Sequence, residues 1–229
     1  GAGMKWKDAL KKRVNAKPDL RVFLNDEIRQ QMNFRDSVPS CCLDMGVPEW
    51  IESYAGQPEN PEYGFTYIGN LSFERDSHRM LDAFLNSKHR ESRILIFGAA
   101  DSRIQKRYRG IPELVFAGRK DQREVFEALK RVEYAVCHFP DHRPHIFQTP
   151  TKLLEYACLH KPIVANPSRS NLRVSRELGI EVVWGGDWIF DALQIPAAPP
   201  SNARFAPASV SWRQRFAQSG IWDHLHPLT

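Results

Sequence analysis

Short apolar stretches alternate with amphipathic stretches along the chain from Phe65 to Leu193. The apolar stretches are bounded by Gly or Pro, and the segments between them repeat apolar residues at helical spacing, as Val125, Leu129 and Val132 do. This alternation predicts strands joined by helices, and a parallel sheet buried on both faces. The expected strands are 65–69, 93–98, 114–117, 134–139, 162–165 and 181–184. The expected helices are 77–88, 101–109, 122–131, 151–160, 171–178 and 188–193.

The chain outside this repeat divides into an N-terminal and a C-terminal part. The first part, 1–64, contains a basic amphipathic stretch up to Pro18, an expected strand at 21–24, an expected helix at 26–32 and a loop-rich linker at 35–64. The last part, 196–229, holds a Pro-rich linker and a helix that begins near Ser211. We therefore expect one Rossmann-like α/β domain at 65–195, with helices on both faces of a parallel sheet.

Composition narrows the classes of function only slightly. The 229 residues carry a net charge of +5 and are 42% hydrophobic, which is enough for a core. A mildly basic chain suits an anionic ligand, a nucleic acid or an acidic membrane surface. Basic and acidic residues are interspersed and no nucleic-acid-binding motif is present, so we expect no nucleic-acid partner.

The sequence also bears on the compartment. No apolar run reaches the roughly 18 residues of a membrane span. The four cysteines have neither a disulfide-framework nor a metal-site spacing, and those at Cys137 and Cys158 lie in apolar runs that predict buried thiols. We expect a cytoplasmic protein. Its basic N-terminal stretch could also contact a membrane surface.

The most informative stretch runs from Thr149 to Ala165, where a loop rich in His and Pro enters an expected helix. We expect Thr149 to cap this helix and Pro150 to take its first position. Lys152 and Glu155 are three residues apart and so share one face. A helix N-terminus with a lysine favours an anion such as phosphate, and a glutamate one turn later can accept hydrogen bonds from sugar hydroxyls.

Further candidate ligand contacts follow the expected strands, because ligands of doubly wound sheets bind at the carboxyl ends of the strands. Gly69 and Arg75 follow the first strand, where a glycine lets a phosphate approach the backbone and an arginine can pair with it. Gly118 and Arg119 follow the third strand, where a nucleobase could lie. Each turn alone is also consistent with an ordinary connection. None is a complete G-x-G-x-x-G, so no nicotinamide or flavin cofactor is indicated.

Three histidines, His138, His142 and His145, belong to the strand and loop before the helix at 151–160. This spacing does not hold them on one face and no carboxylate cluster joins them, so we expect no metal and a loop that lines a polar ligand. His142 or His145 could serve as a general base, or could simply be exposed. A nucleophilic hydrolase is not indicated, because the sequence has no G-x-S-x-G.

Taken in order, these segments resemble the C-terminal, nucleotide-sugar-binding domain of GT-B glycosyltransferases, closest to the retaining family-4 type. The similarity includes Tyr67-Ile-Gly-Asn-Leu-Ser, Ile94-Leu-Ile-Phe-Gly and, most specifically, the Pro-x-Lys-x-x-Glu-Tyr block at 150–156. It covers about residues 65–216. The resemblance implies a nucleoside-diphosphate sugar as donor, a saccharide or lipid-linked acceptor, no cofactor, and no metal.

The resemblance also implies residue roles, although it assigns no catalytic residue here. Arg75 and Lys152 would meet the diphosphate and stabilise the leaving group in place of Mg²⁺. Glu155 would hold the ribose hydroxyls. The turn after the third strand would face the base, and the loop before the helix would lie near the sugar or phosphate. The residues of that turn and loop are Gly118, Arg119, Gln148 and Thr149.

Three departures from the family pattern stand out. Phe147 occupies the position, eight residues before Glu155, where the family commonly has a glutamate, and Asn70 replaces the usual arginine after the first strand. The segment 1–64 is much shorter than an acceptor-binding domain, and it resembles the end of one. The chain thus resembles a truncated or degenerate transferase, or half of a split enzyme with an acceptor-binding partner chain. A non-catalytic nucleotide-sugar-binding or scaffold protein is the alternative.

Overall fold

The computed structural model describes residues 10, 18–56, 58, 60–143 and 145–224. The amphipathic stretch expected before Pro18 lies outside the described residues, apart from Leu10. Within the described ranges, none of the helices combines the length and apolar character needed to cross a membrane.

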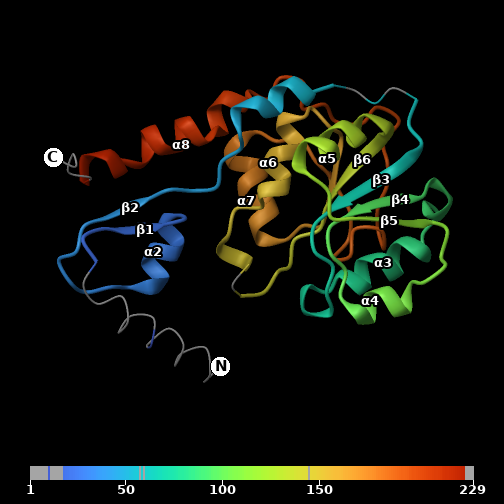
Figure 1. The fold of residues 1–229 in the computed structure, drawn as a ribbon, viewed down its shortest axis with the longest axis horizontal. Coiled ribbons are helices and arrows are strands. Elements are labelled where there is room, and N and C mark those ends of the chain that lie inside the picture. The colour runs from blue at the N-terminus through green and yellow to red at the C-terminus, as the bar shows by residue number, and fades with distance from the viewer. Residues whose placement is uncertain (1–9, 11–17, 57, 59, 144, 225–229) are drawn as a thin grey trace.

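A parallel sheet forms the centre of the fold, with strand order β5–β4–β3–β6–β7–β8 (Figure 1). The chain runs outward from β3 to β5, crosses back to β6 and continues outward to β8, so the order reverses between β3 and β6. All six expected strands are present, and the Rossmann-like α/β prediction is confirmed. The strands are β3 (Tyr63–Ile68), β4 (Ile94–Phe97), β5 (Leu114–Gly118), β6 (Val132–Cys137), β7 (Ile163–Ala165) and β8 (Val183–Trp184).

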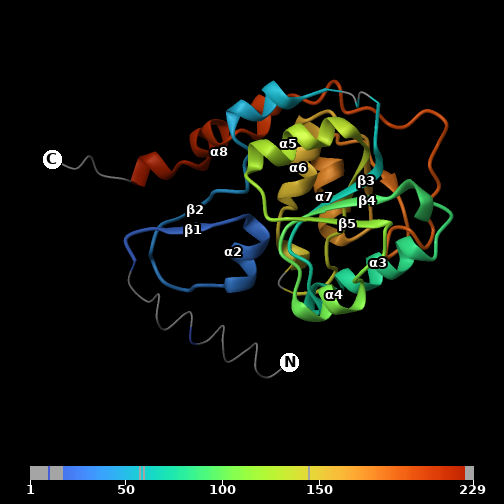
Figure 2. The ribbon, with the colours of Figure 1, turned by 45° about the vertical axis from the view of Figure 1, so that its right-hand side comes forward.

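Helices cover both faces of this sheet (Figures 1 and 2). One face packs on α3 and α4 through a cluster that includes Phe65, Leu81 and Ile104. The other packs on α5, α6 and α7 through a cluster that includes Phe126 and Leu154. The strands are buried on both sides, which explains their continuous apolar runs. The helices are α3 (Ser77–Leu85), α4 (Ser102–Arg107), α5 (Gln122–Ala128), α6 (Thr151–Cys158) and α7 (Arg169–Leu178).

Short polar side chains set where several helices begin. Asp101 accepts a hydrogen bond from the amide of Ile104, and Ser168 accepts one from the amide of Asn171. Asp121 and Glu124 form a reciprocal capping box at the start of α5. Each contact satisfies an amide that the helix itself leaves unbonded.

The N-terminal part forms a small unit beside the main domain. Its strands β1 (Arg21–Phe23) and β2 (Ser40–Cys42) pair in parallel, and α2 (Asp26–Met32) joins them. The expected linker at 35–64 therefore also holds a strand, and it holds a 3-10 helix at Glu49–Tyr54. The Ser-Cys-Cys strand has no apolar alternation, and its partner lies far along the chain, so its sequence gives no local sign of a strand.

The end of the main domain differs from expectation in one place. Residues 188–193 form turns and not the expected helix, and Ile189 adopts a left-handed conformation with φ of 65°. The last helix, α8 (Trp212–Ser219), leaves the main domain and passes over β2 (Figures 1 and 2). The amide of Trp212 donates to the carbonyl of Val47, so the two segments that connect the main domain to its neighbours run side by side.

Candidate functional site

A cavity of about 380 Å³ opens where β3 and β6 end, at the reversal of strand order. We call it the central cavity. Five of the residues expected at a ligand site line it: Gly69, Arg75, Gln148, Thr149 and Lys152. They come from the turn after β3, the loop before α6 and the first turn of α6. Parallel sheets with this order bind their ligands at this position.

Lys152 and Glu155 form an ion pair on the first turns of α6, as their spacing predicts. Nζ of Lys152 lies 2.5 Å from Oε2 of Glu155, and Nε2 of Gln122 donates to Oε1 at 2.9 Å. Glu155 is only 3% exposed, and it is not part of the cavity lining. The carboxylate therefore anchors a lysine whose side chain is 35% exposed and borders the cavity.

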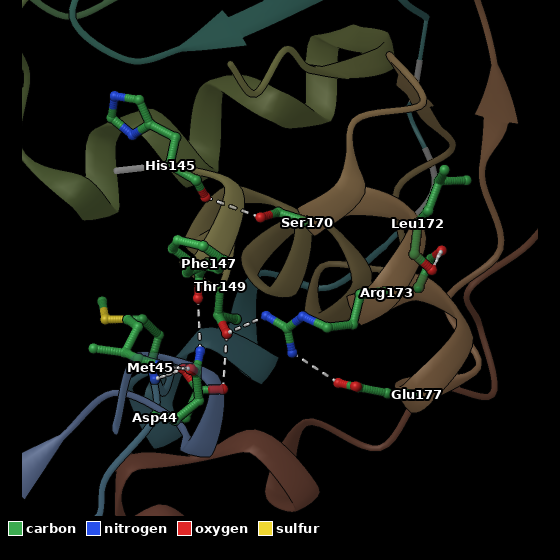
Figure 3. A network of polar contacts seen from close by, with 12 residues as sticks. Asp44, Met45, His145, Phe147, Thr149, Ser170, Leu172, Arg173 and Glu177 are labelled. Atoms are coloured by element: carbon green, nitrogen blue, oxygen red, sulfur yellow. Dashed lines mark hydrogen bonds and ion pairs between the residues drawn. The ribbon is translucent and has the colours of Figure 1, made fainter. Parts of the chain in front are cut away.

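Thr149 does not cap α6, and this prediction is wrong. The helix begins at Thr151, Pro150 occupies the cap position, and no side chain caps the helix. The Thr149 hydroxyl donates to Oδ2 of Asp44 at 2.7 Å and accepts from Arg173 at 3.5 Å (Figure 3). A carboxylate from the N-terminal unit thus diverts the hydroxyl. The uncapped N-terminus of α6 borders the cavity, where its partial positive charge favours an anion.

The N-terminal unit holds the loop that precedes α6. Nδ2 of Asn25 donates to the carbonyl of Phe147 at 2.7 Å, and Arg143 donates to Gln31 at 3.2 Å. Leu24 and Met45 complete the wall of the central cavity from this side. These contacts join residues that are more than a hundred positions apart, so no local sequence pattern identifies them.

Gly118 and Arg119 lie in a different cavity, which we call the edge cavity. It measures about 510 Å³ and sits at the ends of β4 and β5. The two cavities adjoin where the turn after β3 meets the turn after β4, since the amide of Ala99 donates to Oδ1 of Asn70 at 3.2 Å. Gly98 lies in this contact with φ of +126°. The structure therefore divides the predicted site residues between two neighbouring cavities, apart from Glu155, which lines neither.

The charges around the central cavity favour a negatively charged ligand. Arg75 and Lys152 contribute the cationic groups. His138, which also lines the cavity, is 6% exposed, and burial together with nearby Arg75 lowers its pKa to about 4. Burial also lowers the pKa of His145, whose Nδ1 lies 3.0 Å from Oε1 of Gln148. His138 is thus a neutral imidazole near neutral pH.

Two buried thiols, one in the wall of the central cavity and one at the far end of α6, are not poised for nucleophilic attack. Cys137 and Cys158 are buried, as the sequence predicts. Burial raises the pKa of each thiol to about 12, so the reactive thiolate is scarce at neutral pH.

Comparison with known proteins connects this fold to glycosyltransferases. No family model and no curated protein matches the sequence. HepE of Anabaena, in complex with UDP and glucose, has a TM-score of 0.58 and 14% identity over 78% of this chain and 52% of that one. Sucrose-phosphate synthase of Thermosynechococcus elongatus has a TM-score of 0.62 and 11% identity, covering 96% and 61%.

The glycosyltransferase AviGT4 of avilamycin A biosynthesis has a TM-score of 0.57 and 13% identity, covering 90% of this chain and 65% of that one. Identities this low show the fold alone. The chain has the Rossmann-like fold of the GT-B glycosyltransferases, and it spans about half the length of HepE.

Proposed function

We propose that this chain binds a nucleoside-diphosphate sugar as the donor part of a metal-independent, retaining glycosyltransferase. The acceptor would be a saccharide or a lipid-linked saccharide, and a partner chain would supply further acceptor contacts. The observation that carries the proposal is the cationic central cavity at the uncapped N-terminus of α6. The bound UDP and glucose of HepE belong to a protein of the same fold and support this choice of ligand.

The proposed mechanism assigns charge neutralisation to protein groups. Arg75, Lys152 and the N-terminus of α6 would stabilise the diphosphate as it leaves the sugar. Glu155 would keep the Lys152 ammonium in place and, on the family resemblance, contact the ribose. The nucleobase would extend past Asn70 into the edge cavity, towards Gly118 and Arg119.

A non-catalytic nucleotide-sugar-binding protein is the second candidate, and Phe147 favours it. This residue stands where the family commonly has a glutamate, and its ring is 8% exposed beneath the guanidinium of Arg143 at 5.2 Å. An apolar ring cannot provide the carboxylate that the family uses near the donor sugar. Both candidate functions use the same donor site, but only the transferase would transfer the sugar to an acceptor.

Replacement of Lys152 by alanine tests the donor site. We expect UDP affinity without metal to fall about 10- to 150-fold, because a charge-assisted contact contributes about 1.5–3 kcal/mol. Calorimetric titration in the presence of a chelator measures this, with UDP, GDP and ADP compared in the parent chain. Lys106→Ala, an exposed lysine on α4, is the matched control and leaves affinity unchanged. Equal affinity in both variants would remove Lys152 from the site.

Glu155→Gln separates two roles of the carboxylate. If Glu155 contacts the ribose, the variant loses discrimination between UDP and deoxy-UDP, because an amide is a weaker acceptor than a carboxylate. If the carboxylate only positions Lys152, the affinities for UDP and deoxy-UDP fall equally, by about tenfold or less. The ratio of the two dissociation constants decides, and an unchanged ratio would contradict the ribose contact.

A further inference from the structure

A second cavity lies beside the central cavity, and we call it the lateral cavity. It measures about 240 Å³ and occupies the ends of β6, β7 and β8, on the same edge of the sheet. His138 lines both cavities and forms their common wall. A ligand in the lateral cavity would therefore lie next to a ligand in the central cavity.

Carboxylates are the charged groups that line the lateral cavity, and Arg79 lies over the ring of Trp188 at 4.9 Å. Asp76, Asp141 and Asp187 line the cavity, and its lining within the described chain includes no lysine or arginine. Asp141 accepts from the amide of Arg169 at 3.0 Å, and Asp76 lies 3.6 Å from Arg79. Asp187 is exposed, and the described side chains offer it no ion pair or hydrogen bond. The Asp187 carboxylate can therefore accept hydrogen bonds from hydroxyl or ammonium groups of a ligand.

The indole of Trp188 can also bind hydroxyls in this cavity. Trp188 is half-buried, and its ring centroid lies 5.8 Å from that of His138. The indole N–H is left without a hydrogen-bond acceptor by the residues that the structure describes. It adds a donor and an apolar wall to the acidic rim, a combination that suits the mixed polar and apolar surface of a sugar ring.

His138 is the observation that points to a ligand. It is 6% exposed and lines both cavities, and within the described ranges its ring nitrogens make no hydrogen bond. An imidazole that faces a cavity with both nitrogens open can hydrogen-bond a molecule bound there. A neutral imidazole offers one donor and one acceptor, which is the pairing that a hydroxyl satisfies.

A metal ion fits this cavity less well than an organic ligand. Among the described residues, no three His, Cys, Asp or Glu side chains are close enough to share a metal. The three carboxylates are therefore dispersed around the cavity, as hydrogen bonds to a ligand with several hydroxyls require.

We propose that the lateral cavity binds a sugar ring of the acceptor saccharide, with Asp187, Trp188 and His138 as its hydrogen-bonding residues. This assignment rests on the proposed donor function of the central cavity. The shared wall at His138 would bring an acceptor hydroxyl to the boundary with the donor site. Asp187, which has no ion pair among the described residues, favours a ring that is neutral or carries an amino group.

The test follows the indole N–H of Trp188 by two-dimensional ¹H–¹⁵N spectroscopy, with Trp188→Phe to assign the signal. Methyl glucoside, methyl galactoside, N-acetylglucosamine and glucosamine are each titrated to about 100 mM, well above a millimolar dissociation constant. Each titration is run with and without UDP. We expect at least one sugar to shift the Trp188 signal saturably. We expect Asp187→Asn to weaken the binding of that sugar at least about tenfold.

The outcomes separate this proposal from the donor function. Lys152→Ala should lose UDP affinity and keep the sugar response, whereas Asp187→Asn should do the reverse. If no sugar shifts the signal, or if Asp187→Asn leaves the response intact, the lateral cavity is not an acceptor subsite. If UDP-glucose shifts the Trp188 signal and UDP does not, the cavity holds the sugar of the donor and the acceptor assignment is wrong. Absence of UDP binding with an intact sugar response would instead reject the donor function alone.

Discussion

Replacement of Gly98 by alanine should destabilise the protein by about 4 kcal/mol or more, the largest effect that we expect from any single substitution here. Gly98 has φ of +126°, a conformation that L-residues rarely adopt, and an added Cβ would lie 2.2 Å from the carbonyl oxygen of Gly69. That oxygen belongs to the backbone of the neighbouring turn, so it cannot rotate away. Unfolding in urea, monitored by circular dichroism, measures the loss.

Gly179→Ala is the matched control for the Gly98 variant. Gly179 ends α7 with φ of +65°, and an added Cβ there meets nothing within 4 Å. This variant should lose only about 1–2 kcal/mol of the free energy of unfolding, the cost of holding an L-residue in the left-handed conformation. Similar losses in the two variants would show that the contact between the turns after β3 and β4 is not tight. At temperatures where the Gly98 variant stays folded, we also expect weaker UDP binding, because these turns form the boundary between the central and edge cavities.

Replacement of Lys161 by methionine should stabilise the protein by about 2–3 kcal/mol near neutral pH. Lys161 follows α6 and is 1% exposed, and its Nζ has no hydrogen-bond partner in the part of the chain that the structure describes. Burial, with a smaller contribution from Lys130, lowers its pKa from 10.5 to about 8. Methionine fills a similar volume without a buried charge.

The effect of Lys161 on stability should depend on pH in a defined direction. Between about pH 8 and 10.5 the unfolded chain holds a proton that the folded chain has released. Its contribution to the free energy of unfolding therefore rises with pH across this window. The advantage of Lys161→Met should shrink in the same window, as thermal unfolding from pH 7 to 10 can measure. Lys106→Met, at an exposed position, should show neither effect. A pH-independent gain would contradict the lowered pKa.

Local sequence patterns were sufficient to predict the central sheet. Each strand is an apolar run, in several cases bounded by Gly or Pro, and helix starts such as Asp101 depend on contacts within three residues. The failures depend on distant contacts. The strand at 40–42 exists because it pairs with 21–23, and Thr149 turns from α6 because Asp44 lies beside it. At 188–193 the helical spacing of apolar residues is overridden by a left-handed turn at Ile189.

The residues of the candidate site also fall into those that local sequence patterns predict and those that depend on distant contacts. Arg75 and Lys152 could be predicted to share a cavity, because both follow strands that end at the reversal of the sheet order. Leu24 and Met45 could not, because they reach the central cavity only through the packing of the N-terminal unit. His138 was identified as one of three histidines, but its burial and its position between two cavities depend on the tertiary structure.

The paired segments at Val47 and Trp212 have a mechanical consequence. The carbonyl of Met45 also accepts a hydrogen bond from Nε of Arg215 at 3.1 Å. The segment that leads out of the N-terminal unit therefore accepts two hydrogen bonds from α8, one from Trp212 and one from Arg215. Met45 also lines the central cavity, so α8 is bonded directly to a residue of the cavity wall. We therefore expect a displacement of α8 to change the width of the central cavity through Met45, without any change in the sheet.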